Sequence, residues 1–272
     1  MLKVCKFGGT SAADSVALKR VKAIIESDPT RRYIVVSAPG KRHSEDIKMT
    51  DQLYAAHKCL EETGKCGESF EQVKERFREI ARTIGLGNIE ELLSETEQDI
   101  IREKSKDFTA SRGEYLIGKL FAKFIGVPFV DARDVVRFKD GELDAEKTYS
   151  LIAAALKDLP RAVIAGYYGA DDEGNVVTFT RGGADISGAI VARVVNADLF
   201  EKWTDVSGVF TSDPHKANAE HIDKLSYGEF GMDFIHPVLH SDSITPVWEA
   251  GIPVCIKNTF CPEESGTLIV KK

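Results

Sequence analysis

Short runs of apolar, β-branched residues alternate along the chain with longer stretches of helical periodicity. The run at 33–37 (Tyr-Ile-Val-Val-Ser) has no polar alternation, which is typical of a parallel strand buried on both faces. Further strands are predicted at residues 2–7, 127–130, 161–166, 176–179, 199–203, 254–257 and 267–270. Helices are predicted at residues 16–27, 50–63, 112–124, 145–156, 187–195 and 243–250. This alternation predicts an α/β fold: a three-layer αβα sandwich with a mainly parallel central sheet.

Two segments depart from the simple alternation. Residues 67–107 are polar and charged, and their pattern indicates a helical pair broken at 85–88 (Gly-Leu-Gly-Asn). We predict that this pair is helical and packs as a cap beside a substrate pocket. Residues 171–174 (Asp-Asp-Glu-Gly) are the predicted turn of a hairpin that contains the strand at 176–179.

Charge and composition exclude several classes of function. The 272 residues include 36 Lys plus Arg and 43 Asp plus Glu, a net charge of −7, which argues against nucleic acid as a partner. No apolar run approaches the ~20 residues that span a bilayer. The N-terminus lacks the apolar stretch of a signal peptide, so a cytoplasmic location and no membrane partner are expected.

The metal-ligating side chains do not form a convincing site. The five cysteines are scattered, without a C-x-x-C pair, and are expected to be reduced thiols. His236 and His240 could share a helix face, but Pro237 interrupts that helix and no third ligand is adjacent. We therefore predict no metal-ligating residues.

Ligand-binding and catalytic residues are expected in the loops that follow the strands, because ligands of such sheets bind beyond the carboxyl ends of the strands. The first is 6–11 (Lys-Phe-Gly-Gly-Thr-Ser). Gly8 and Gly9 permit close approach of the backbone, and their N–H groups could face phosphate oxygens. Lys6 could place an ammonium on a moving phosphoryl group. A plain tight turn is the simpler interpretation of this loop taken alone.

Three more loops add fixed charges. The loop 37–42 (Ser-Ala-Pro-Gly-Lys-Arg) is either a ligand loop or a solvated basic turn. In the loop 180–185 (Thr-Arg-Gly-Gly-Ala-Asp), Arg181 could grip a carboxylate bidentately, whereas Asp185 could serve the site or simply cap a helix. The loop from 203 to 214 begins at a strand end, where Thr204 and Asp205 could bond a purine edge or orient a lysine.

Together these segments resemble the aspartokinase family. The matching motifs are K-F-G-G-T-S at 6–11, S-A at 37–38 with T-D-Q-L at 50–53, S-R-G-E at 111–114, R-G-G-A-D at 181–185 and T-D-V-S-G-V-F-T-S-D-P at 204–214. They occur in the family's order over essentially the whole chain. The chain is thereby identified as similar to the catalytic domain of aspartokinases, within the amino acid kinase superfamily and fold.

The resemblance implies an activity and a role for each motif residue. The implied reaction is ATP-dependent phosphorylation of the β-carboxylate of L-aspartate to 4-phospho-L-aspartate, the first step of aspartate-family (lysine) biosynthesis, with Mg²⁺ as cofactor. The implied catalytic residues are Lys6 and Asp185. The implied aspartate-binding residues are Ser37, Thr50, Glu114, Arg181, Gly182 and Gly183. The implied nucleotide-binding residues are Lys6, Gly8, Gly9, Thr204, Asp205, Phe210 and His215.

The resemblance also implies an organisation. An N-terminal lobe of about residues 1–165 would bind the acid, and a C-terminal lobe of about 166–272 would bind the nucleotide. Family members normally continue into ACT domains, so ending at 272 leads us to expect no ACT domain and no feedback inhibition by that route. L-Aspartate is the expected small-molecule partner, and homodimerisation is left open.

Five positions depart from the family pattern. Ala184 replaces Ser, Thr180 replaces Gly, Phe210 replaces Tyr, His215 replaces Arg, and Pro237 replaces a nucleotide-contacting Lys. Two alternatives therefore stand beside aspartate phosphorylation. One is a kinase for a different small carboxylate or amino acid, and the other is a weakly active homologue that acts as a nucleotide-binding regulatory module.

Overall fold

The computed structural model describes residues 1–180, 182–212, 219–230 and 241–271. Within them, one eight-stranded sheet has the order β12-β14-β13-β9-β1-β2-β6-β3. Its strands are β1 (Lys3–Phe7), β2 (Arg31–Val36), β3 (Phe129–Val130), β6 (Ala162–Ala165), β9 (Leu199–Thr204), β12 (Lys224–Ser226), β13 (Val254–Asn258) and β14 (Thr267–Val270). The six strands from β13 to β3 pair in parallel, whereas β14 runs antiparallel to β13. The predicted mainly parallel sheet is confirmed.

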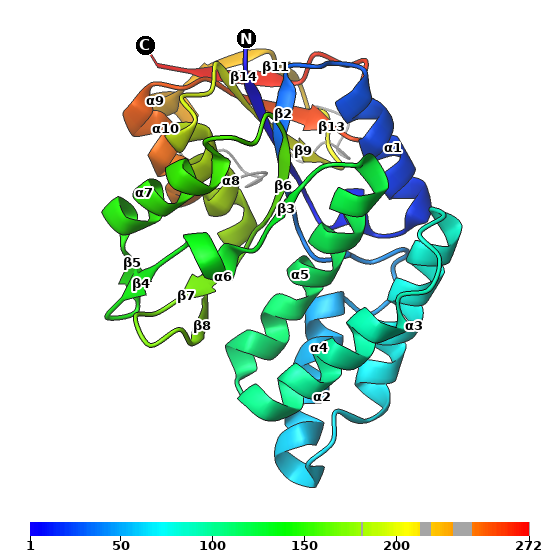
Figure 1. The fold of residues 1–272 in the computed structure, drawn as a ribbon. Coiled ribbons are helices and arrows are strands. Elements are labelled where there is room, and N and C mark those ends of the chain that lie inside the picture. The colour runs from blue at the N-terminus through cyan, green and yellow to red at the C-terminus, as the bar shows by residue number, and fades with distance from the viewer. Residues whose placement is uncertain (181, 213–218, 231–240, 272) are drawn as a thin grey trace.

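Helices cover both faces of this sheet (Figure 1). On one face α8 (Gly183–Val194) packs against β1, β2 and β9, and on the other α5 (Lys106–Ile125) packs against β2, β3 and β6. The remaining helices of the two layers are α1 (Ser15–Glu26), α7 (Ala145–Leu156) and α10 (Thr245–Ala250), the last preceded by a 3₁₀ turn at Ser241–Ile244. The αβα sandwich is therefore confirmed, and none of the described helices is long and apolar enough to cross a membrane.

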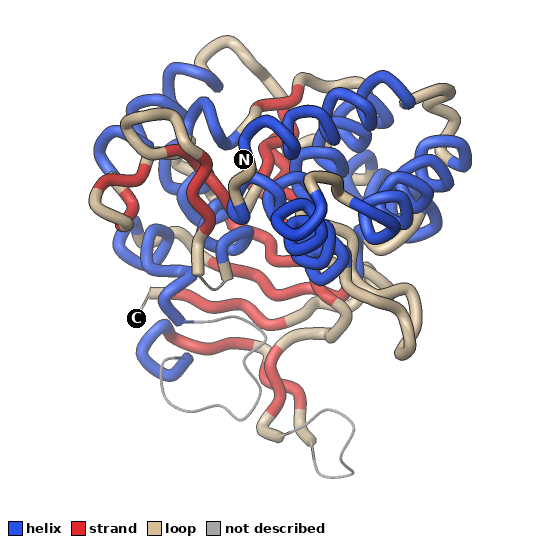
Figure 2. Tube along the Cα trace, turned by 90° about the horizontal axis from the view of Figure 1, so that it is seen from below, coloured by secondary structure: helices blue, strands red, loops and turns tan. Residues whose placement is uncertain are grey.

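A helical extension stands away from the sheet, as Figures 1 and 2 show. It consists of α2 (Met49–Thr63), α3 (Gly67–Thr83), α4 (Glu90–Glu103) and the adjoining part of α5. In α3 the apolar residues Phe70, Val73 and Phe77 recur at helical spacing and are fully buried. The predicted helical pair at 67–107 is confirmed, and it packs on α2 and α5.

Short elements appear where the sequence carries little periodicity. The antiparallel pair β7 (Tyr168–Ala170) and β8 (Val176–Thr178) is the predicted hairpin. Several features were not predicted: the edge strand β12, the hairpin β4 (Phe138–Lys139) and β5 (Glu142–Leu143), and the pair β10 (Val209–Phe210) and β11 (His221–Ile222). The same holds for the short helices α6 (Ala132–Val135) and α9 (Tyr227–Phe230) and the 3₁₀ turn Thr10–Ala12.

Two helices begin earlier than predicted. Helix α5 starts at Lys106 because the Ser105 hydroxyl accepts a hydrogen bond from the Phe108 amide (3.2 Å), an N-cap ahead of the apolar pattern. Helix α8 starts at Gly183, after Gly182 in the left-handed conformation (φ 61°). Asp185 therefore lies inside the first turn of α8, so its interpretation as the N-cap is wrong.

Candidate active site

The loops that follow the parallel strands meet at one edge of the sheet. The Gly40 amide, after β2, donates a hydrogen bond to the Gly9 carbonyl, after β1 (2.8 Å). A Cβ at Gly40 would lie 2.6 Å from the Gly9 carbonyl carbon, so only glycine permits this contact. The fold thus places two predicted ligand loops directly against each other.

At the centre of this edge, one carboxylate holds two lysines. The Lys6 ammonium on β1 lies 2.7 Å from Oδ1 of Asp185, and the Lys202 ammonium on β9 lies 2.7 Å from Oδ2. Lys6 and Lys202 are paired in the β1–β9 register, so they emerge side by side on the face that α8 covers. Burial opposes ionisation of Asp185, but the two ammonium groups hold its pKa below the ordinary value.

The backbone amides of Gly8 and Gly9 in the first loop differ in their hydrogen bonding. The Gly8 amide donates to the Trp203 carbonyl of β9 (3.0 Å), so the prediction that this N–H faces phosphate is wrong: sheet pairing already uses it. A Cβ at Gly8 would lie 3.9 Å from the Lys6 ammonium, and Gly8 therefore keeps the approach to that amine open. Among the described residues, no acceptor is assigned to the Gly9 amide.

Three of the predicted acid-binding residues, Ser37, Thr50 and Glu114, lie next to a close contact at Gly113. A Cβ there would lie 2.7 Å from that of Ala38, in the loop after β2, and 3.4 Å from Met49 at the start of α2. Thr50 and Glu114 are the next residues along α2 and α5. The missing side chain of Gly113 therefore lets both helices close on the same loop, which also contains the half-buried Ser37.

Glu114 is the most perturbed carboxyl group of this region. Its side chain is 5% exposed, and burial raises its pKa to about 7, against the opposing effect of a hydrogen bond from the Ala38 backbone. Lys6 also acts on this carboxyl electrostatically, which links the two groups across the loop. Within the described part of the chain, Oε2 of Glu114 has no hydrogen-bond partner. A ligand cation could supply that partner.

The loop after β6 contacts helix α2. Tyr167 has φ 77°, a conformation that costs energy for a non-glycine residue and is concentrated at functional sites. A Cβ at Gly183 would lie 3.0 Å from its ring, and the Tyr167 hydroxyl lies 3.2 Å from that of Tyr54 on α2. Gly182 and Gly183 thus lie beside Tyr167, whereas Arg181 is outside the described residues.

The predicted nucleotide residues follow β9. Thr204 ends the strand and its hydroxyl donates to the exposed Asp205 carboxylate (3.1 Å). Phe210 lies edge-on against His221, with ring centroids 5.3 Å apart. These two rings line a pocket of about 420 Å³ together with Ser207, Glu264, Ser265 and Gly266. His215 and Pro237 lie outside the described residues.

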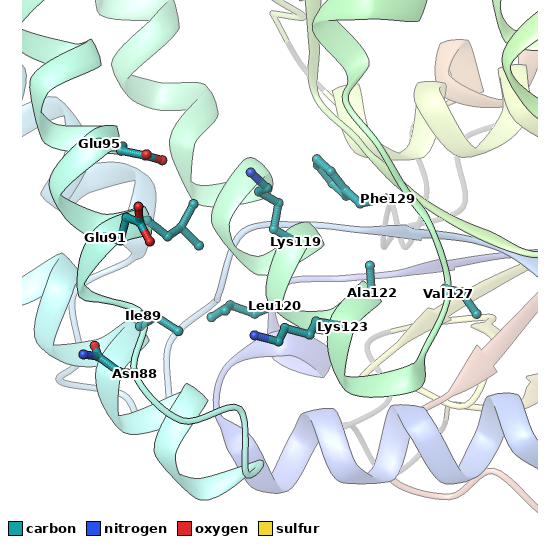
Figure 3. A pocket seen from close by; sticks show the side chains of 11 residues that line it. Asn88, Ile89, Glu91, Glu95, Lys119, Leu120, Ala122, Lys123, Val127 and Phe129 are labelled. Carbon is teal, nitrogen blue, oxygen red and sulfur yellow. The ribbon is translucent and has the colours of Figure 1, made fainter.

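A separate pocket lies between α4 and α5 (Figure 3). It measures about 480 Å³, with Glu91 and Glu95 on one wall and Lys119 and Lys123 on the other. None of the predicted site residues lines it. No group of three or more metal-ligating side chains occurs in the described ranges, and His236 and His240 fall outside them.

Three further residues belong to the site without having been predicted. Lys202 is a charged residue within the buried strand β9, where a buried charge demands a partner, and its place in a predicted strand could have found it. Tyr167 carries no sequence signal, because a strained backbone angle shows only in three dimensions. Arg76 of α3, 4% exposed, donates to the carbonyls of Ala13 (2.8 Å) and Gly40 and so ties the helical extension to the glycine loops.

Comparison with known proteins finds aspartokinases that are similar to this chain in sequence and in structure. Aspartokinase 3 of Bacillus subtilis is 34% identical over 293 residues, covering 100% of this chain and 64% of that protein. The Clostridium acetobutylicum aspartate kinase structure superposes with a TM-score of 0.94 at 42% identity, covering 100% of this chain and 63% of the other.

The structure of Escherichia coli aspartokinase III in complex with aspartate and ADP superposes with a TM-score of 0.85 at 27% identity, over 100% of this chain and 65% of that one. This chain thus spans a little under two thirds of the length of these relatives. The sequence pattern of the Amino acid kinase family matches residues 1–258. The chain belongs to the amino acid kinase family.

Proposed function

We propose that this chain transfers the γ-phosphoryl group of ATP to the β-carboxylate of L-aspartate, forming 4-phospho-L-aspartate and ADP. The observation that carries the proposal is the buried Lys6 ammonium, held by Asp185 and acting electrostatically on Glu114, whose Oε2 has no hydrogen-bond partner among the described residues. The similarity to aspartokinases supports aspartate as the acid.

Aspartate would bind on the side of the helical extension. Ionised Glu114 would accept hydrogen bonds from the α-ammonium, a partner that the described part of the chain does not give its Oε2. The Thr50 hydroxyl, at the start of α2, and the Gly183 backbone would contact the remaining polar atoms of the acid. Arg181 keeps its proposed role as the partner of the α-carboxylate. These contacts would leave the β-carboxylate pointing at Lys6.

The transfer step needs no general base, because a carboxylate is already an anionic nucleophile at pH 7. A β-carboxylate oxygen would form a bond to the γ-phosphorus as the bond to the β–γ bridging oxygen breaks, with the electron pair leaving on ADP and no net proton transfer. Lys6 and the Gly9 amide would neutralise charge on the moving group. Asp185 would position Lys6, and positioning would supply much of the rate.

The nucleotide would lie across β9 on the side of Phe210. The pocket at Phe210 and His221 is of a size to take a base or sugar, and Thr204 and Asp205 lie along the chain between Lys202 and Phe210. The Mg²⁺ that accompanies ATP would be held mainly by phosphate oxygens, because the described residues form no cage of three ligands and Asp185 is committed to two lysines. The ion would supply charge neutralisation.

A hydroxylamine trap tests the proposal, because hydroxylamine converts an acyl phosphate into a coloured hydroxamate. The wild-type chain is incubated with MgATP and L-aspartate, and in parallel with glutamate, N-acetylglutamate and other small acids. We expect hydroxamate from aspartate. Lys6→Met should lower kcat by about 100-fold or more, whereas Lys19→Met, an exposed lysine on α1, should leave it unchanged.

Each other outcome contradicts the proposal in a distinct way. Turnover with a different acid alone would make this chain a kinase for that acid, the alternative to which the Ala184 and Thr180 departures point. Nucleotide binding without turnover of any acid would make it a regulatory module. Full activity in Lys6→Met would remove the lysine from the mechanism.

A further inference from the structure

The pocket between α4 and α5 carries opposite charges on its two walls. Glu91 and Glu95 lie about one helical turn apart on α4. Lys119 and Lys123 have the same spacing on α5. Figure 3 shows the two pairs on opposite sides of the cavity. Its volume of about 480 Å³ falls within the range of about 300–1,000 Å³ that is typical of small-molecule sites.

The opposite charges face each other without forming ion pairs. Within each pair, like charges four residues apart on one helix repel each other. In the part of the chain that the structure describes, neither of the two glutamates and neither of the two lysines takes part in an ion pair. The fold thus sets two carboxylates opposite two ammonium groups and leaves a cavity between them. A ligand that carries both charges would relieve the repulsion within each pair.

The Lys119 ammonium is held by an aromatic support and not by a carboxylate. It donates to the Tyr115 hydroxyl (2.8 Å), a neutral partner that leaves the charge uncompensated. The Tyr115 ring packs edge-on against Phe129 of β3, with ring centroids 5.9 Å apart. Phe129 in turn lies against Gly118, where a Cβ would be 2.6 Å from the ring. The amine is therefore held in position before any ligand arrives, which favours binding.

The rest of the pocket lining is mainly apolar. It is contributed by Ile89, Leu92, Leu120, Ala122, Val127 and Phe129. A hydrocarbon group that covered this surface would remove it from water. A ligand with one charge alone would be attracted to one wall and repelled by the other, whereas a ligand with both charges would be attracted to both.

We propose that this pocket binds a small zwitterion whose carboxylate and ammonium are separated by an apolar body. The carboxylate would accept hydrogen bonds from Lys119 and Lys123, and the ammonium would donate to Glu91 and Glu95. The apolar body would lie on the hydrocarbon lining, so the ligand would bridge α4 and α5. The inference goes beyond the proposed function and is independent of it, because none of the predicted site residues lines this pocket.

The test uses ε-aminocaproate as the probe, with caproate and hexylamine as analogues that each keep one of its two charges. Each compound is titrated into the full chain and followed by the NMR signals of the backbone amides, with L-aspartate present so that the proposed acid site is occupied. We expect shifts in α4 and α5 and a Kd on the order of 1 mM or tighter for ε-aminocaproate. Each single-charge analogue should bind at least tenfold more weakly.

Substitutions on both walls locate the binding. Lys119→Met and Glu95→Gln should each weaken binding of ε-aminocaproate at least fivefold. Lys58→Met removes an exposed lysine of α2, outside the pocket, and should bind as wild type does. Because Glu91, Glu95 and Lys123 are exposed, the affinity should also fall as salt is added.

Three results would overturn the inference. They are equal affinity for caproate and ε-aminocaproate, wild-type affinity in both Lys119→Met and Glu95→Gln, and no binding of the probe at tens of millimolar. Urea denaturation of the variants shows that each is folded during the titration. Phosphorylation of an acid is measured separately by the hydroxylamine trap, so failure of the proposed function leaves this test intact.

Discussion

Gly40 and Gly9 touch through their backbones, with the Gly40 amide 2.8 Å from the Gly9 carbonyl oxygen. The contact locks the loop after β2 onto the loop after β1, and no side chain fits between them. We predict that Gly40→Ala pushes the Gly9 loop out of place, because its Cβ would also lie 2.8 Å from the Thr10 amide. Overpacking of this kind costs about 1–3 kcal/mol, so KM for ATP should rise roughly tenfold. Steady-state kinetics measures this change.

Gly228→Ala is the matched control for that substitution. A Cβ at Gly228 meets its nearest neighbour, the Ser226 hydroxyl, only at 4.0 Å, so the added methyl group fits. KM should stay at the wild-type value. If Gly40→Ala also keeps the wild-type KM, the two loops can move apart without loss of ATP binding, and the prediction is wrong.

Arg76 is expected to stabilise the junction between the helical extension and the glycine loops. Arg76→Met would leave the carbonyls of Ala13 and Gly40 without this donor and remove the guanidinium 3.5 Å from Asp46. The free energy of unfolding should fall by about 1–3 kcal/mol. Arg78→Met on the same helix breaks a largely exposed pair with Glu90 and should cost less than about 1 kcal/mol. Urea denaturation measures the free energy of unfolding of both variants. Equal decreases in the two variants would contradict the prediction.

Glu114 should make stability depend on pH. Its pKa is about 7 in the folded chain and 4.5 ordinarily, so between these values the unfolded chain releases a proton that the folded chain retains. The contribution of Glu114 to the free energy of unfolding therefore falls as pH rises from 4.5 to 7, by about 3 kcal/mol in total, and is constant above. Glu114→Gln should exceed wild type in stability at pH 8 and match it near pH 4.5. Parallel stability curves for the two proteins would show that Glu114 titrates normally.

The ionisation of Glu114 should also make the binding of aspartate depend on pH. This carboxyl group must be ionised to accept the α-ammonium of aspartate, so KM for aspartate should rise about tenfold for each pH unit below 7. The KM for ATP should change much less over this range. Exchange of exposed Glu91 for Gln serves as the control and should leave both profiles unchanged. A flat KM for aspartate between pH 5.5 and 7.5 would exclude Glu114 as the ammonium partner.

Tyr54 and Tyr167 join the helical extension to the loop after β6 through their hydroxyl groups. Tyr54 lies one helical turn beyond Thr50 on α2, so this bond fixes the position of the face that carries Thr50. Tyr54→Phe should raise KM for aspartate about two- to tenfold, the value of one hydrogen bond, without changing KM for ATP. In a double-mutant cycle, Tyr167→Phe should add little to Tyr54→Phe. Additive effects would mean that the two hydroxyls act separately.

The fold could be predicted from the sequence where burial leaves a pattern. The apolar run of β2 and the helical spacing in α3 each report their surroundings directly, and the predicted strand 267–270 coincides with β14. The hairpin of β4 and β5 was not predicted, although Asp140 and Gly141 both have positive φ, as a type I′ turn requires. Strands of two residues are too short to show alternation.

The site could be predicted in part for a related reason. Lys6 near the end of β1 and Asp185 in the first turn of α8 each lie beside a pair of glycines, and several such glycine-and-charge motifs at strand ends together indicate a ligand site. Lys202 stands inside a strand, and its meeting with Asp185 depends on the β1–β9 register and on the angle of α8. A lysine within a predicted strand indicates that a partner is needed, but the identity of that partner follows from tertiary packing and not from the local sequence.

The proposed phosphate-binding residues and the proposed acid-binding residues are held by different parts of the fold. The lysines belong to the sheet, whose register fixes their separation, whereas Thr50 and Glu114 are carried by helices α2 and α5, which meet the loop after β2 at Gly113. Substitutions in those helices can therefore change which acid the proposed site binds without moving Lys6, the lysine that would contact the phosphate. Descendants of such a scaffold can diverge in acceptor preference without rebuilding their catalytic centre.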